Sequence, residues 1–101
     1  MKPEINIEGH QTGEQYECRV RVVEGSSSTE HRVTVEKPYR DHVAGPEIPV
    51  EQLIRKSFEF LLEREPKESI LRRFELRMIS RYFPEYEKEM RSTFRAANEK
   101  R

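Results

Sequence analysis

The chain has 101 residues, of which 34% are hydrophobic and 38% are charged, with 19 basic side chains, 19 acidic side chains and no formal net charge. Its length corresponds to one domain. Since globular domains average about 25% charged residues, we expect a small core and a heavily solvated surface. The zero net charge argues against a protein that binds polyanions through its overall charge.

One cysteine, Cys18, is present, so no disulfide can form within the chain, as is usual in a reducing compartment. The first ten residues lack the apolar segment of a secretory signal. The longest strongly apolar run is Phe60-Leu61-Leu62, whereas a membrane-spanning helix needs roughly 20 apolar residues. These features predict a cytoplasmic protein that does not associate with a membrane.

Residues 1–40 are predicted to form a three-stranded antiparallel β-meander. Between Glu4 and Tyr39 apolar and polar residues alternate, which is typical of a sheet with one solvated face. Clusters of turn-forming residues at 10–13 and 25–29 separate the three runs. The apolar positions are Ile5 and Ile7 in the first run, Tyr16, Cys18, Val20 and Val22 in the second, and Val33 and Val35 in the third.

The pairing of the second and third strands can be predicted from residue types. The preferred register pairs like with like on the buried face, namely Val20 with Val35 and Val22 with Val33. A shift by two residues would place Arg21 opposite Arg32, at a cost of roughly 0.2–1 kcal/mol for two like charges.

The second half, residues 50–97, is predicted to be helical, after a connector at residues 41–49. From Val50 the apolar residues recur with helical spacing, which predicts an amphipathic helix that ends near Glu65, before Pro66. A further helix is predicted from Pro84 to Ala97. Because three strands alone are marginally stable, we expect a single α+β domain in which two to four α-helices pack on one sheet face.

The stretch Arg72–Met90, RRFELRMISRYFPEYEKEM, superficially resembles a DNA-reading element. Residues 67–83 could form one helix, with Arg73, Arg77 and Arg81 aligned in its polar gap, or two short helices that break near Glu75. The spacing does not fit a helix-turn-helix, because the apolar residue Ile79 arrives too soon after the turn and Phe83-Pro84 ends the second helix early.

Three strings in the helical half carry a family resemblance: FEFLLEREP (58–66), SILRRF (69–74) and SRYFPEY (80–86). They resemble short conserved hypothetical proteins of bacteria, over about residues 50–90. The resemblance implies a small, uncharacterised bacterial protein, and it implies no activity, cofactor or substrate.

Motifs for known chemistry are missing from the sequence. His10, Cys18, His31 and His42 do not have the two-to-four-residue spacing of a zinc site. The Gly25–Thr29 cluster lacks the lysine and the following helix of a phosphate-binding loop. Cys18 is predicted to be a small core residue. No catalytic, metal-binding or cofactor-binding residue is therefore predicted.

Three functions remain as hypotheses. The preferred one is a non-catalytic protein-interaction or accessory module that binds a protein partner or a second copy of itself, through an aromatic cluster formed by Tyr82, Phe83, Tyr86 and Phe94. The second is a nucleic-acid-binding module, through a basic surface formed by Arg19, Arg21 and Arg32 on the sheet or by Arg73, Arg77 and Arg81 on a helix. An enzyme without a recognisable motif is the third.

Overall fold

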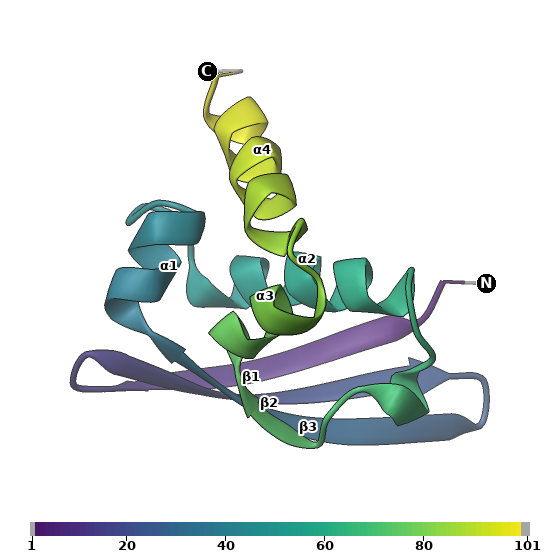
Figure 1. Ribbon diagram of the computed structural model, residues 1–101. Coiled ribbons are helices and arrows are strands. Elements are labelled where there is room, and N and C mark those ends of the chain that lie inside the picture. The colour runs from purple at the N-terminus through teal and green to yellow at the C-terminus, as the bar shows by residue number, and fades with distance from the viewer. Residues whose placement is uncertain (1, 100–101) are drawn as a thin grey trace.

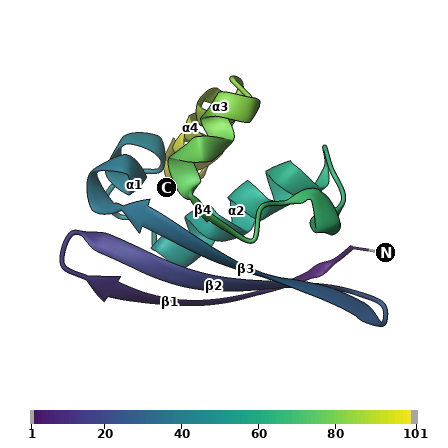
Figure 2. The same ribbon diagram turned by 60° about the horizontal axis from the view of Figure 1, so that its bottom comes forward.

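The computed structural model describes residues 2–99, and the side chains of residues 2–95. It has an α+β architecture, in which a sheet of strand order β1-β2-β3-β4 carries the helices on one face (Figures 1 and 2). The strands are β1 (Glu4–Thr12), β2 (Gln15–Glu24), β3 (Ser27–Glu36) and β4 (Arg73–Glu75). The helices are α1 (Lys37–Val43), α2 (Val50–Leu62), α3 (Ile79–Tyr82) and α4 (Tyr86–Glu99), with short 3₁₀ turns η1 (Lys67–Ser69) and η2 (Leu76–Met78).

The first three strands form the predicted antiparallel meander, but the predicted register is wrong. Val20 lies opposite His31, and Cys18 lies opposite Val33. The cause is the turn: a two-residue turn at Gly25-Ser26, with a φ of 59° at Gly25, lets β3 begin at Ser27 rather than after a long loop. Each residue of β2 therefore pairs with a residue of β3 that lies nearer to the turn than predicted. His31 consequently lies on the buried face of the sheet.

The predicted connector is partly a helix, since α1 already begins at Lys37. Pro38 lies in the first turn of α1, where its missing N–H is not needed. Arg40 is buried, with its guanidinium 5.5 Å from the ring centre of Tyr16, and its Nη1 donates to the carbonyl oxygen of Ile48 at 2.9 Å. The apolar pattern of the sequence did not indicate α1, because this helix is rich in polar residues and packs partly through a buried arginine.

Helix α2 is the predicted amphipathic helix, although it ends at Leu62 instead of near Glu65. Leu53, Ile54 and Phe58 are fully buried and belong to the same core cluster as the apolar face of the sheet. Arg55 donates from Nη1 to the carbonyl oxygen of Ile5 at 2.9 Å, so it covers one backbone acceptor of β1.

Helix α4 was predicted from Pro84 to Ala97 and begins instead at Tyr86. Tyr86 is fully buried, and its hydroxyl forms a 2.6 Å hydrogen bond with the hydroxyl of Ser57 on α2. Arg64, just after α2, forms ion pairs with Glu85, just before α4, at 3.3 Å and with Glu89 of α4 at 2.9 Å. The side chain of Ala97 lies outside the described residues.

Residues 67–83 form neither one helix nor two, contrary to both predicted alternatives. They contain η1, the short strand β4, η2 and the single-turn helix α3. β4 pairs parallel to β3, with Arg73 beside Arg32 and Phe74 beside Val33. Phe74 packs inward against Phe58, with 6.2 Å between ring centres. The sheet is consequently mixed, and the predicted alignment of Arg73, Arg77 and Arg81 along one helix is wrong.

Candidate functional site

An apolar groove lies between the end of α2 and the segment 67–83. Its volume is about 370 Å³, and its walls combine Leu61 of α2 and Glu65 just after it with residues of the segment from η1 to α3. The residues that line the groove are Leu61, Glu65, Ser69, Ile70, Leu71, Phe74, Met78, Ile79, Tyr82 and Phe83. Mostly irregular backbone thus forms one side of the groove, and the C-terminal end of α2 contributes to the other side.

A buried histidine fixes the irregular side of the groove. His31 Nδ1 lies 2.8 Å from the carbonyl oxygen of Leu71, and His31 Nε2 lies 2.8 Å from the hydroxyl of Thr29. Because a carbonyl oxygen only accepts, Nδ1 carries the proton and Nε2 accepts from Thr29. Burial lowers the pKa of His31 below its ordinary value, so the neutral ring is favoured. The backbone at Leu71 is therefore held to β3 by a side chain.

Apolar anchors hold the remainder of this segment. Ile70, Leu76 and Ile79 are buried in the core. Leu71, after the first of these anchors, and Tyr82, after the last, turn outward, with exposed fractions of 49% and 63%. Among the described side chains these two are the large apolar residues that remain exposed. They lie on the rim of the groove, so the groove opens onto an apolar surface.

Glu65 is the charged residue among those that line the groove. Its side chain is half-buried, and burial raises the pKa of its carboxyl group. No hydrogen bond or ion pair of this carboxylate is formed with any of the described side chains. The groove therefore combines apolar walls with one carboxylate that has lost part of its hydration without gaining a cation.

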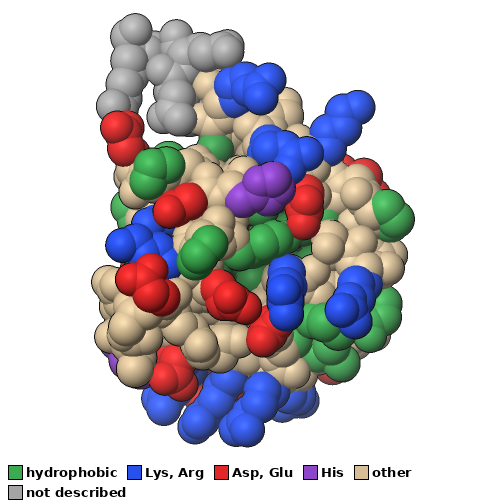
Figure 3. All heavy atoms as spheres, turned by 60° about the vertical axis from the view of Figure 1, so that its left-hand side comes forward, with side chains coloured by type: hydrophobic (Ala, Val, Ile, Leu, Met, Phe, Trp, Pro, Cys, Tyr) green, Lys and Arg blue, Asp and Glu red, His purple; other side chains and the backbone are tan. Residues whose placement is uncertain are grey.

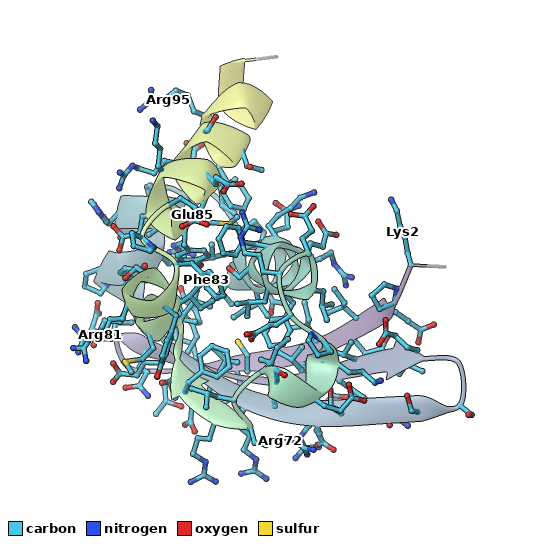
Figure 4. The ribbon with its side chains drawn as sticks, turned by 45° about the vertical axis from the view of Figure 1, so that its right-hand side comes forward. Lys2, Arg72, Arg81, Phe83, Glu85 and Arg95 are labelled. Carbon is cyan, nitrogen blue, oxygen red and sulfur yellow. The ribbon has the colours of Figure 1, made fainter. Side chains whose placement is uncertain are left out.

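The structure separates the four aromatic residues that were predicted as partner contacts. Tyr82 lies on the rim, and Phe83 lines the groove with its ring 5.8 Å from that of Phe60 (Figure 4). Tyr86 and Phe94 are buried in the core. The sequence did not single out Leu71 or Glu65, because their place at the groove depends on how the 67–83 segment folds.

The predicted basic residues lie mainly on the open face of the sheet. Arg19, Arg32 and Arg73 are adjacent to one another across β2, β3 and β4 and so form a row, with Arg21 on the same face. Figure 3 shows basic side chains gathered below the sheet, with acidic side chains beside them. Arg77 is paired with Glu75 at 2.9 Å, and Arg81 points away from the body of the molecule (Figure 4).

Glutamates flank this arginine row. Glu8 lies opposite Arg19, Glu30 lies opposite Arg21, and Glu30 also forms a 3.4 Å ion pair with Arg19. Arg32 and Arg73 form no ion pair within residues 2–95. The structure thus combines parts of both predicted basic surfaces, but the field of the row is offset by its neighbours.

Cys18 is 3% exposed, as predicted for a core residue. Burial, together with the nearby carboxylate of Glu51, raises the pKa of its thiol to about 11, so it is held as the thiol rather than the nucleophilic thiolate. Within residues 2–99, no three His, Cys, Asp or Glu side chains are grouped so that they could hold a metal ion.

In the same range, the structure contains no helix of the length and hydrophobicity that crossing a membrane requires. Comparison with protein-family models, with curated proteins and with solved structures gives no match.

Proposed function

We propose that this protein is a small interaction module that binds a protein partner, or a second copy of itself, through the apolar groove. The observation that carries the proposal is the pair of exposed side chains on the rim, Leu71 and Tyr82. Tyrosine is enriched in the binding sites of protein interfaces, because its large ring contributes contact area and its hydroxyl tolerates water.

The size of the groove supports a role in binding side chains. Pockets that hold small ligands usually span roughly 300–1,000 Å³, and about 370 Å³ is at the small end of this range. Such a volume suits one or two side chains of a partner. The His31 bridge to Leu71 supports a preformed site, and a preformed site loses less entropy when it binds.

The proposal can be tested by selecting random twelve-residue peptides on the wild-type protein. The selected peptides are then titrated into ¹⁵N-labelled protein. We expect amide shifts concentrated in residues 65–83, and loss of binding in Tyr82→Ser. Val23→Ser is the matched control, because Val23 is a partly exposed apolar residue on the opposite sheet face. Selected peptides that bind Tyr82→Ser as well as wild type would contradict the proposal.

Self-association needs a separate measurement. Sedimentation velocity over a wide concentration range would show a concentration-dependent mass if a second copy occupies the groove. In that case Tyr82→Ser should sediment as a monomer, while Val23→Ser should behave as wild type. A constant monomeric mass would leave a different protein as the partner.

Nucleic-acid binding is the second candidate, and the arginine row formed by Arg19, Arg32 and Arg73 favours it. If the row holds phosphates, affinity for random-sequence DNA or RNA should fall steeply with salt. Changing all three to Gln should lower the slope of log K against log salt by roughly 0.7–0.9 for each lost contact. We rank this function second because glutamates flank the row and offset its charge.

A further inference from the structure

Building on the proposed function, we infer that the groove selects a protein segment in which a basic side chain lies next to an apolar anchor, and that Glu65 pairs with the cation. The preference for a basic partner follows from what surrounds Glu65 in the free protein and from what would happen to this carboxylate when the groove is filled.

Apolar residues surround Glu65 at the groove. Leu61, Ile70 and Phe74 line the same groove, and the other polar groups of the lining are the neutral hydroxyls of Ser69 and Tyr82. The backbone N–H of Glu65 donates to the carbonyl oxygen of Leu61 at 2.9 Å, which continues the end of α2 by one turn and fixes where residue 65 lies. The end of the helix therefore sets the backbone position from which this side chain reaches the groove.

The basic residues nearest to Glu65 along the chain are already paired. Arg64 forms ion pairs with Glu63, Glu85 and Glu89, and its guanidinium lies 3.5 Å from the ring centre of Phe60. Lys67 is buried between Glu24, at 3.2 Å, and Glu68, at 2.7 Å. Neither cation is available to Glu65 without giving up several contacts.

The basic residues on the other side of the groove do not line it. Arg72 and Arg81 are adjacent in sequence to the rim residues Leu71 and Tyr82, but both side chains are exposed and lie outside the groove (Figure 4). The chain itself therefore supplies no cation to the Glu65 carboxylate within the described residues.

An occupied groove makes this arrangement selective. An apolar segment that fills the groove would remove the water that still solvates Glu65, and a buried carboxylate without a counter-ion is costly. A segment with a lysine or arginine beside its anchor would replace this water by a charge-assisted hydrogen bond. An acidic segment would meet a like charge, so the same residue both favours basic partners and rejects acidic ones.

The test uses three blocked dipeptides that share one anchor. They are N-acetyl-phenylalanyl-lysine amide and its analogues with glutamine or glutamate in place of lysine, each also made in the reverse order. Each is titrated into ¹⁵N-labelled protein, and the amides of residues 65–83 are followed. We expect wild type to bind the lysine peptide roughly fivefold more tightly than the glutamine peptide, the scale of a partly exposed ion pair, and the glutamate peptide most weakly.

Two variants and one change of conditions complete the design. The Glu65→Gln variant should lose the preference for the lysine peptide but should still bind the glutamine peptide. Glu59→Gln should retain the preference, because Glu59 is an exposed residue on α2 outside the groove, paired with Lys56. In wild type, high salt should weaken binding of the lysine peptide and leave binding of the glutamine peptide unchanged. This last measurement does not depend on any variant being folded.

The outcomes separate the inference from the proposed function. If none of the peptides shifts the groove amides, the groove does not take apolar side chains, and the proposed function is wrong. If the glutamine peptide binds and the lysine peptide binds no better, or if Glu65→Gln keeps the preference, the role of Glu65 is wrong and the proposed function stands.

Discussion

The meander β1–β3 and the segment 67–83 are held in place by different interactions. β2 is paired along its whole length, with β1 on one side and β3 on the other. β4 pairs over three residues only, and its segment depends on the His31–Leu71 hydrogen bond and on the buried anchors Ile70, Leu76 and Ile79. Irregular backbone can therefore present a defined apolar surface where a few buried side chains replace a ladder of backbone hydrogen bonds.

The largest effect is expected at Phe58, where the two regions meet. Phe58 is fully buried, with its ring 5.4 Å from that of His31 and 6.2 Å from that of Phe74. Phe58→Ala should lower the free energy of unfolding by about 3–5 kcal/mol, because it leaves a cavity beneath both regions. Urea denaturation followed by circular dichroism would measure this. A loss below about 1 kcal/mol would mean that the regions do not share this contact.

The next effect concerns the meander alone. Cys18→Ser places a hydroxyl on the buried face and should destabilise the protein by roughly 1–3 kcal/mol, while peptide binding at the groove is retained. Native wild type should also react slowly with a thiol reagent, since burial raises the pKa of Cys18 to about 11. Rapid labelling under native conditions would show that the thiol is accessible.

A third effect isolates the bridge between the two regions. Burial lowers the pKa of His31 below its ordinary value of 6.5, so the unfolded chain takes up this proton more readily than the folded protein. Stability from His31 is therefore complete above pH 6.5 and is lost as the pH falls below it. One proton limits the slope to about 1.4 kcal/mol per pH unit.

The control for this third prediction is a variant in which the ring is absent. Unfolding free energies of wild type and His31→Gln should be compared from pH 8 to pH 5, above the range in which most carboxylates titrate. We expect the difference between the two proteins to shrink as the pH is lowered. Parallel pH dependences in wild type and variant would assign the effect to other groups.

The smallest effect on stability is expected on the rim. Tyr82 is 63% exposed, so Tyr82→Ser should change the free energy of unfolding by no more than about 0.5 kcal/mol. The same substitution should abolish peptide binding, which separates a binding role of this side chain from a structural one. A large loss of stability would show that Tyr82 supports the segment instead of forming its surface.

The sequence was informative wherever one face of a long element is buried. Alternation predicted which residues of β1–β3 face the core, and helical spacing predicted α2. Their register depended on a two-residue turn at Gly25-Ser26, which the longer run of small polar residues concealed. The alternation of apolar and polar residues shows which face of the sheet a side chain lies on, but the pairing between strands follows only when the turn length is also known.

The groove itself was not predicted. β4 has three residues, too few for any period to be visible, and its partner β3 is distant in sequence. The fully buried His31 appeared in the sequence as a polar residue within a strand, although its role is to bind a backbone carbonyl 40 residues away. Tyr82 remains a predicted contact residue, whereas Glu65 and Leu71 acquire their positions only through tertiary contacts.

The parallel pairing of β4 with β3 has a consequence for the order of folding. The two hairpins β1–β2 and β2–β3 form between strands joined by short turns. β4 can pair with β3 only after α1 and α2 have brought the chain back to β3. Closing so long a loop costs more entropy than closing a hairpin. We therefore expect the walls of the groove to form late and to open first, so that amide hydrogens of residues 71–82 exchange through local opening while those of β2 exchange only when the whole protein unfolds.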